Sequence, residues 1–258
     1  LAVLTNQPAR PTRLVGIRDP SEEMSVGEYA ALAHAAIDEV AAAHGVAVVA
    51  GGTGLYLRAV IDDLRLPGRW PALRSELEAD PDTAGLYRRL VGLDPLAASR
   101  MEPGNRRRIV RALEVTLGSG RPFSGFGPGL ESYPPTRYRL VGLRLARPEL
   151  DRRIEQRLAA MAAGGLVEEV RALVERHPGG LSRTAGQALG YREVLRHVVD
   201  GEPLEERVAE AVRRTRRFAR RQEAWFGRDP RITWYDAADN PLAVAERVLG
   251  DWSSRCRR

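Results

Sequence analysis

The sequence of 258 residues contains no lysine, so arginine supplies all 40 basic side chains behind the formal net charge of +6. A Walker A phosphate loop requires Gly-Lys-Ser/Thr, which this sequence therefore cannot contain. Two explanations of the arginine usage stay open. A GC-rich genome writes arginine for lysine, and the guanidinium group also binds phosphate bidentately and stacks on bases. Only the positions of the arginines can separate the two.

Cysteine and long apolar runs are also scarce. The single cysteine, Cys256, excludes an intramolecular disulfide and a cysteine metal cluster, and the four scattered histidines have no metal-ligand spacing. No apolar run approaches membrane-spanning length, and the first residues show no signal-peptide pattern. With 43% hydrophobic and 29% charged residues, the composition is typical of a globular protein. We expect a cytoplasmic monomer without a membrane partner.

The order of apolar and glycine-rich segments predicts an α/β fold. Residues 13–18 are expected to form a short strand, Ser25 to cap a helix that runs to about residue 43, and the apolar residues 46–50 to form a buried strand. The Gly-Gly-Thr-Gly sequence at 51–54 then turns into a further helix. A strand, a glycine turn and a helix in this order are typical of α/β proteins.

Prolines interrupt the pattern from residue 67 onward and predict short helices without a strand. Strands are expected again at 138–145 and 232–235, with amphipathic helices at 150–163 and 205–226 between them. We therefore assign the first part of the core to 1–65, an inserted helical lobe to 66–136 and the second part of the core to 137–258.

The glycine turn is the first candidate site. Backbone amides that enter a helix favour an anion, and the hydroxyl of Thr53 can bond a phosphate or a base. Glycine turns also join many strands to helices without binding anything.

Arginines spaced by four residues form two further candidates. Arg107 and Arg111 share a helix side, where they can hold neighbouring phosphates, and the alternative is a solvated face paired with Glu114. Arg153 and Arg157 have the same spacing near the expected ligand edge of the sheet. Their alternative is a salt-bridged surface helix.

Two more segments are compatible with nucleic acid. Gly190 permits close backbone approach, and Tyr191 or Arg192 can stack on a splayed base, although a helix kink explains the segment equally well. Residues 213–222, followed by Trp225, form a dense basic helix with interleaved aromatic residues, which is the strongest nucleic-acid signal in the composition.

Together and in order, these segments resemble the tRNA dimethylallyltransferases, also called tRNA isopentenyltransferases. The matching stretches are residues 17–20 with 25–29, 51–56, 105–115, 153–157 with 161 and 164–170, 187–193, and 215–222 with Trp225. Each motif alone is modest, but their common order runs through nearly the whole sequence.

The resemblance implies a P-loop-kinase-like parallel sheet core with an inserted helical lobe that grips the tRNA anticodon stem-loop. It implies transfer of a dimethylallyl group from dimethylallyl diphosphate to N6 of adenine 37, beside the anticodon, in tRNAs that read U-starting codons. Mg²⁺ would help the diphosphate to leave. Thr53 would lie beside the reacting groups and Arg157 would hold the diphosphate, so both would be catalytic. The residues expected to contact tRNA are Thr53, Arg74, Arg107, Arg108, Ile109, Val110, Arg111, Gln187, Gly190, Tyr191 and Arg192.

The sequence departs from the family pattern at its front. Family members begin with a strand and a P-loop, followed by an aspartate taken as the base for N6, and none of these is present. We therefore expect a missing front segment that would carry the Mg²⁺ ligand, and an inactive isolated chain. Thr12 and Arg13 also replace a common His-His pair.

Two other functions compete with prenyl transfer. A catalytically inactive tRNA-binding fragment would bind tRNA in a salt-sensitive way without transferring anything. A related adenylate isopentenyltransferase would act on free nucleotides, which would leave the inserted lobe with no RNA to hold.

Overall fold

The computed structural model describes residues 12–64, 66–127, 129–130, 132–238 and 241–255. The chain divides into two compact units. Unit 1 comprises Leu1–Leu57 and Arg137–Arg258, and unit 2 comprises Arg58–Thr136. The lobe expected at 66–136 lies within unit 2, and its binding of tRNA stays a proposal.

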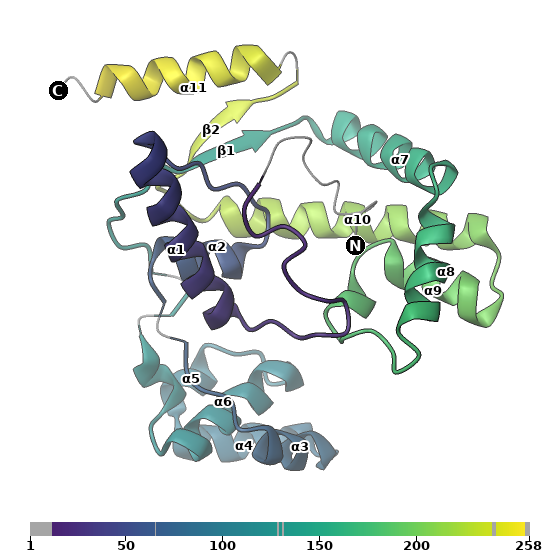
Figure 1. The fold of residues 1–258 in the computed structure, drawn as a ribbon. Helices are drawn as coiled ribbons and strands as arrows, with labels where there is room; N and C mark the ends of the chain where they lie inside the picture. The colour runs from purple at the N-terminus through teal and green to yellow at the C-terminus, as the bar shows by residue number, and fades with distance from the viewer. Residues whose placement is uncertain (1–11, 65, 128, 131, 239–240, 256–258) are drawn as a thin grey trace. The chain divides into compact units, whose positions relative to one another are not determined.

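Unit 1 combines helices with a small parallel sheet, and Figure 1 labels its α-helices and strands. Strands β1 (Val141–Arg144) and β2 (Thr233–Asp236) pair in parallel, with Val141 opposite Thr233 and Arg144 opposite Asp236. This parallel pair confirms the α/β class. The helical elements of unit 1 are α1 (Val26–His44), the start of α2 (Gly54–Ile61), α7 (Arg147–Ala163), α8 (Leu166–Arg176), η2 (Ala185–Gln187), α9 (Tyr191–Asp200), α10 (Leu204–Phe226) and α11 (Pro241–Arg255).

Helix α1 begins where its sequence signal lies. The hydroxyl of Ser25 accepts a hydrogen bond from the Glu28 amide at 3.1 Å, and the Glu28 carboxylate accepts one from the Ser25 amide at 2.7 Å. This reciprocal capping box satisfies two amides that the first turn leaves free. Gly45, with φ of 74°, ends the helix in the left-handed region. The prediction of a helix capped by Ser25 is confirmed.

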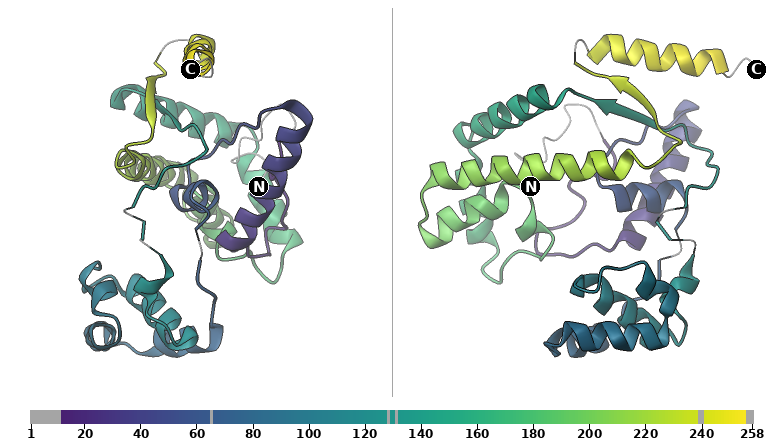
Figure 2. Two further views of the ribbon diagram at one scale, coloured as in Figure 1. Left: turned by 90° about the vertical axis from the view of Figure 1, so that its left-hand side faces the viewer. Right: turned by 180° about the vertical axis from the view of Figure 1, so that it is seen from behind.

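The long helix α10 organises the second half of unit 1 (Figure 2). Its buried Ala211 and Val212 pack against Ile154 and Leu158 of α7. A second apolar cluster joins α8 to α9, with Tyr191 at its centre. Because α10 also contacts α9, it links α7 and α9, and α9 in turn packs against α8.

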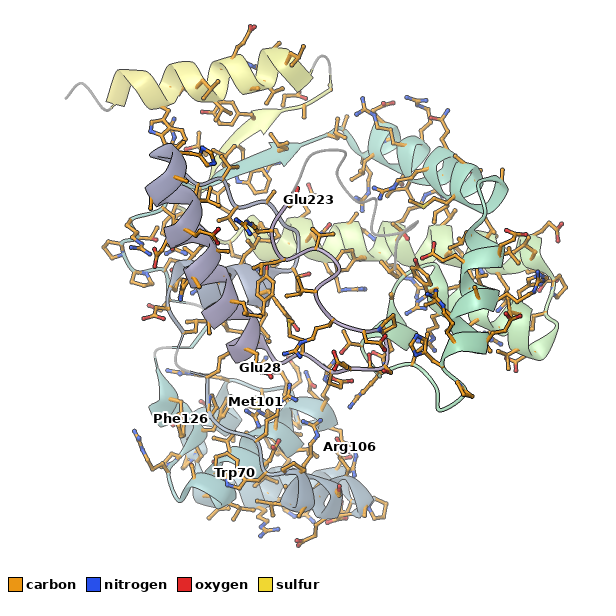
Figure 3. The ribbon with its side chains drawn as sticks, viewed as in Figure 1. Glu28, Trp70, Met101, Arg106, Phe126 and Glu223 are labelled. Atoms are coloured by element: carbon orange, nitrogen blue, oxygen red, sulfur yellow. The ribbon has the colours of Figure 1, made fainter. Side chains whose placement is uncertain are left out.

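Unit 2 is an all-helical body in its described residues. It contains the rest of α2 and then α3 (Pro71–Ala79), α4 (Thr83–Leu93), α5 (Pro95–Ser99), α6 (Arg106–Ser119) and η1 (Phe123–Phe126). Leu90, Ile109 and Leu113 are 0% exposed and lie in its apolar core. Figure 3 labels Trp70, Met101, Arg106 and Phe126 of this unit.

Two predicted strands are wrong. Residues 13–18 form turns and bends, and the positive φ of Leu14 (65°) and Gly16 (67°) is incompatible with a strand. Residues 46–50 have no strand assignment, and Val48 is 83% exposed. A buried parallel strand needs neighbouring strands to pair with it and helices to cover its faces, and no strand in the described part of the chain pairs with this segment.

Candidate functional site

The glycine turn at 51–54 leads directly into α2. The carbonyl of Thr53 accepts the first helical hydrogen bond, from the Leu57 amide at 3.1 Å, while the Thr53 side chain is exposed. The turn contacts α10, because the Gln222 amide nitrogen donates to the Gly52 carbonyl at 2.8 Å. The indole of Trp225 lies directly over Gly54. Thr53 therefore presents its hydroxyl from a backbone held on both sides.

Arg157 is exposed on α7 and makes no hydrogen bond or ion pair with any residue that the structure describes. Its neighbours differ, since Arg152 and Arg153 bind Glu149 at 2.8 and 2.6 Å. Hydrogen bonds from Arg152 and then Arg153 lower the pKa of Glu149 to about 2. Of the predicted pair, Arg153 is thus salt-bridged and Arg157 is the guanidinium free for an anion.

The segment at 187–192 is built around a buried carboxylate. Gly190 has φ of 85°, and its amide donates to Glu193 at 2.8 Å. Glu193 is 1% exposed and also accepts from Arg214 of α10. Gln187 and Arg192 remain exposed beside this anchor. The helix-kink explanation is wrong here, because η2 ends at Gln187 and α9 begins at Tyr191.

The predicted stacking role of Tyr191 does not suit its position. Tyr191 is 0% exposed, and its hydroxyl donates to Glu169 at 2.6 Å. A ring enclosed in the core cannot stack on a base, so Arg192 is the stacking candidate in this segment.

Arginines of α9 and α10 gather around Arg214. Burial, followed by the neighbouring charges of Arg192, Arg217 and Arg221, lowers the pKa of Arg214. Arg192, Arg217 and Arg221 are exposed and have no carboxylate partner among the described residues. Mutually repelling cations at a surface favour a polyanion that neutralises them.

In unit 2 the predicted tRNA contacts on α6 divide into surface and core. Arg107 and Arg108 are exposed, with no ion pair in the part of the chain that the structure describes. Ile109 and Val110 are 0% and 1% exposed and belong to the apolar core. Their side chains pack the helix and do not form its surface.

Arg74 and Arg111 converge on Glu114, whose side chain is 1% exposed. Arg111 lies 3.0 Å from Glu114 Oε1, and Arg74 lies 3.5 Å from Oε2. Glu114 Oε1 also accepts the Trp70 amide at 2.9 Å. Both arginines are therefore anchored by the fold, and their side chains stay partly exposed.

The pairing with Glu114 that the sequence left open holds for Arg111. The sequence did not show how Glu114, Gln222 and Trp225 organise these sites. Glu114 lies between the apolar Leu113 and Val115, and a carboxylate on a buried helix face signals a required partner. Gln222 and Trp225 lie three residues apart on one side of α10, and that side contacts the glycine turn at 51–54. The sequence of α10 alone does not predict that Gln222 and Trp225 contact the glycine turn.

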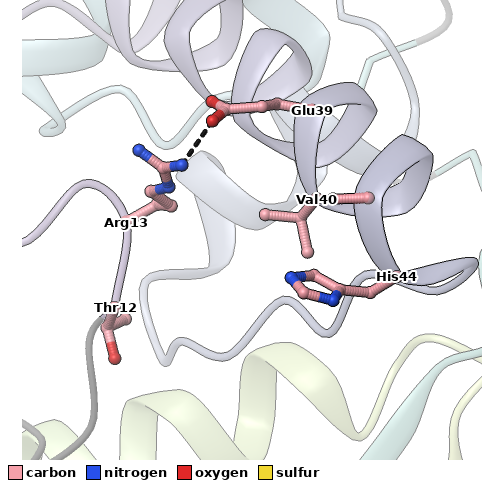
Figure 4. Close-up of a pocket in the computed structure, with 6 residues that line it drawn as sticks. Thr12, Arg13, Glu39, Val40 and His44 are labelled. Atoms are coloured by element: carbon pink, nitrogen blue, oxygen red, sulfur yellow. Dashed lines mark hydrogen bonds and ion pairs between the residues drawn. The ribbon is translucent and has the colours of Figure 1, made fainter.

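An open hollow lined by Thr12, Arg13, Glu39, Val40, Ala43 and His44 lies beside α1 (Figure 4). Arg13 and Glu39 pair with each other across it. The two charged groups of the hollow therefore satisfy each other, and we assign no ligand to it.

The described residues offer no metal cluster and no membrane span. They contain no group of three or more His, Cys, Asp or Glu side chains that could hold a metal ion. None of their helices has the length and apolar character needed to cross a bilayer. The Mg²⁺ ligand was expected in a segment outside these residues, so they do not test that expectation.

The sequence model of the IPP transferase family matches residues 3–229. A tRNA dimethylallyltransferase of Kineococcus radiotolerans is 46% identical over 247 residues, which are 93% of this chain and 76% of that protein. A tRNA dimethylallyltransferase of Salinispora tropica is also 46% identical, over 93% of this chain and 75% of its own length.

Solved structures give the same result. The tRNA isopentenylpyrophosphate transferase of Bacillus halodurans superposes with a TM-score of 0.63 at 30% identity and covers 96% of this chain and 80% of its own. A eukaryotic dimethylallyltransferase acting on tRNA superposes with a TM-score of 0.72 at 22% identity, over 92% of this chain and 64% of that one. At that identity the second likeness supports the fold alone.

Proposed function

Since the chain belongs to the IPP transferase family, we propose that it transfers a dimethylallyl group from dimethylallyl diphosphate to N6 of adenine 37, next to the anticodon, in tRNAs that read U-starting codons. The observation that carries this proposal is the 46% identity, over 93% of the chain, to proteins named tRNA dimethylallyltransferase. The arginines without carboxylate partners in each unit are consistent with a polyanionic substrate.

The proposed reaction is a substitution at carbon. N6 of the adenine forms a bond to C1 of the dimethylallyl group, the C1–O bond breaks, and diphosphate leaves with the bonding electrons. N6 then releases a proton to solvent water. Such a step needs charge stabilisation on the leaving group and an oriented amine.

We assign two residues of unit 1 to this chemistry. Thr53 supplies an exposed hydroxyl from a backbone fixed on both sides, which suits the orientation of a reacting group. Arg157 supplies a guanidinium with no partner in the described part of the chain, which suits the departing diphosphate. Arg192 and its neighbours on α10 would contact the tRNA backbone.

The test removes one hydroxyl. In the full-length protein, Thr53→Ala should lower kcat by at least about tenfold, or roughly 1.4 kcal/mol of transition-state stabilisation. The KM for tRNA should change much less, and Thr53→Ser should recover most of the rate because it restores the hydroxyl. Ser75→Ala, at an exposed position of α3, is the matched control.

Two results would contradict the assignment. Equal changes in kcat and tRNA affinity would make Thr53 a binding residue only. A wild-type protein that binds tRNA in a salt-sensitive way but transfers no prenyl group would instead be the binding module.

A further inference from the structure

The backbone angles of Gly52 and Gly54 do not explain why glycine occupies these two positions. Neither residue has the positive φ that favours glycine. The glycines with positive φ that lie nearest to this turn in the sequence are Gly45 and Gly120. Gly54 is also the first residue of α2, where alanine would favour the helix. The requirement must therefore come from what occupies the space beside each α-carbon.

That space is filled by two side chains of α10. A Cβ added to Gly52 would lie less than 3.0 Å from Nε2 of Gln222. A Cβ added to Gly54 would lie less than 3.0 Å from three atoms of the Trp225 indole. The amide of Gln222 can swing aside at the cost of its hydrogen bond to the Gly52 carbonyl. The rigid indole of Trp225 has no comparable escape.

We propose that Gln222 and Trp225 are positioning residues that clamp the glycine turn and thereby fix Thr53 for prenyl transfer. This inference rests on the proposed function. Thr53 lies between the two clamped glycines, so its backbone is fixed on both sides while its side chain stays exposed. The glycines serve the close approach of α10 and need no bound anion to explain them.

Helix α10 carries a second anchor at a fixed distance from the clamp. Arg214 binds the buried Glu193, which holds the Gly190 turn next to Arg192. Eight residues separate Arg214 from Gln222, and a helical rise of roughly 1.5 Å per residue makes this about 12 Å. One rigid helix therefore sets the spacing between the Thr53 turn and the Arg192 turn.

The first test removes the hydrogen-bond donor of Gln222 and keeps the shape of its side chain. Gln222→Glu preserves side-chain length but places an oxygen against the Gly52 carbonyl. We expect kcat in the full-length protein to fall about tenfold, with the KM for tRNA within about threefold. Hydrogen exchange of the Leu57 amide, which bonds Thr53, should accelerate about tenfold. Glu223→Gln, one residue further along α10 at an exposed position (Figure 3), should change neither quantity.

Exchange does not depend on activity, so it separates the two proposals. Faster exchange in Gln222→Glu, in a protein whose wild type transfers no prenyl group, would support the clamp and refute only the proposed function. Unchanged exchange with a lower kcat would mean that Gln222 acts on the substrate directly, which would overturn the clamp. Unchanged exchange with an unchanged kcat would also overturn it.

The second test uses a pair of substitutions. Gly54→Ala should lower kcat in the wild-type background but cause little further loss in a Trp225→Ala background, because the clash disappears with the indole. If Gly54 served the approach of a substrate, the two losses would multiply, and this would refute the clamp. Should Trp225→Ala fail to fold, Trp225→Leu serves as the background.

Discussion

Replacing Glu114 with alanine is expected to destabilise unit 2 by about 3 kcal/mol. The carboxylate accepts the Trp70 amide at 2.9 Å and lies 3.0 Å from Arg111 and 3.5 Å from Arg74. An unsatisfied amide costs about 1–3 kcal/mol and a lost charged partner about 1.5–3 kcal/mol. Because Arg74 is partly exposed and Arg111 keeps its hydrogen bond to the Pro67 carbonyl, the lower part of this range applies.

Urea denaturation of the full-length protein measures the effect. At a denaturant dependence of about 2 kcal/mol per M, the loss shifts the midpoint of the affected transition by about 1.5 M. Exchange of the Trp70 amide reports the same loss locally, because that amide donates to Glu114. Glu114→Gln keeps an acceptor of the same shape and should cost only about 1–2 kcal/mol.

An exposed glutamate provides the control and the refutation. Glu76→Ala, on the surface of α3, should change stability by no more than about 0.5 kcal/mol. If Glu114→Ala costs no more than Glu76→Ala, the carboxylate does not organise the two arginines, and their placement needs another explanation.

Two further predictions concern unit 2. Arg107→Ala and Arg108→Ala should weaken tRNA binding and flatten its salt dependence without loss of stability. Arg111→Ala should also lower the urea midpoint, because Arg111 donates a hydrogen bond to the Pro67 carbonyl at 2.8 Å. Equal stability of all three variants would refute this distinction. Although burial raises the pKa of Asp94, hydrogen bonds from Ser124 and Ala97 lower it overall. The stability contributed by Asp94 is therefore complete above its ordinary pKa of 3.8 and is lost as pH falls through the lower folded value. Denaturation at several acidic pH values should show this loss in the wild type and a shallower pH dependence in Asp94→Asn.

Local signals in the sequence predict the helices well. Ser25 and Glu28 form a capping box within one turn of the chain, and the amphipathic helix predicted at 205–226 corresponds to α10, which buries Ala211 and Val212. The strand predicted at 46–50 is wrong because burial depends on neighbours elsewhere in the chain. An apolar run therefore predicts a preference for burial but cannot supply the partner.

The same distinction limits prediction of the site. The six ordered motifs were sufficient to indicate the family, but not to show which arginines are anchored. Arg111 binds the carbonyl of Pro67, which is 44 residues away in the sequence. Likewise Gln222 binds Gly52 across 170 residues. Contacts at such separations leave no periodic trace in the sequence.

The arginines have two roles, stabilising the fold and presenting positive charge at the surface. The hydrogen-bond and ion-pair partners of each arginine show which role it has. Arg58 is 4% exposed and donates to the carbonyls of Leu130 and Ser132, while Arg106 donates to carbonyls at the end of α3. A buried guanidinium that satisfies several carbonyls is part of the fold, and its loss leaves those acceptors unpaired.

Exposed arginines without a carboxylate partner, such as Arg157 and Arg192, contribute nothing comparable to folding. Genome composition can explain the choice of arginine over lysine at both kinds of position, but it does not explain why unpaired cations gather around Arg214, where they repel one another. A polyanionic substrate gives that arrangement a physical reason.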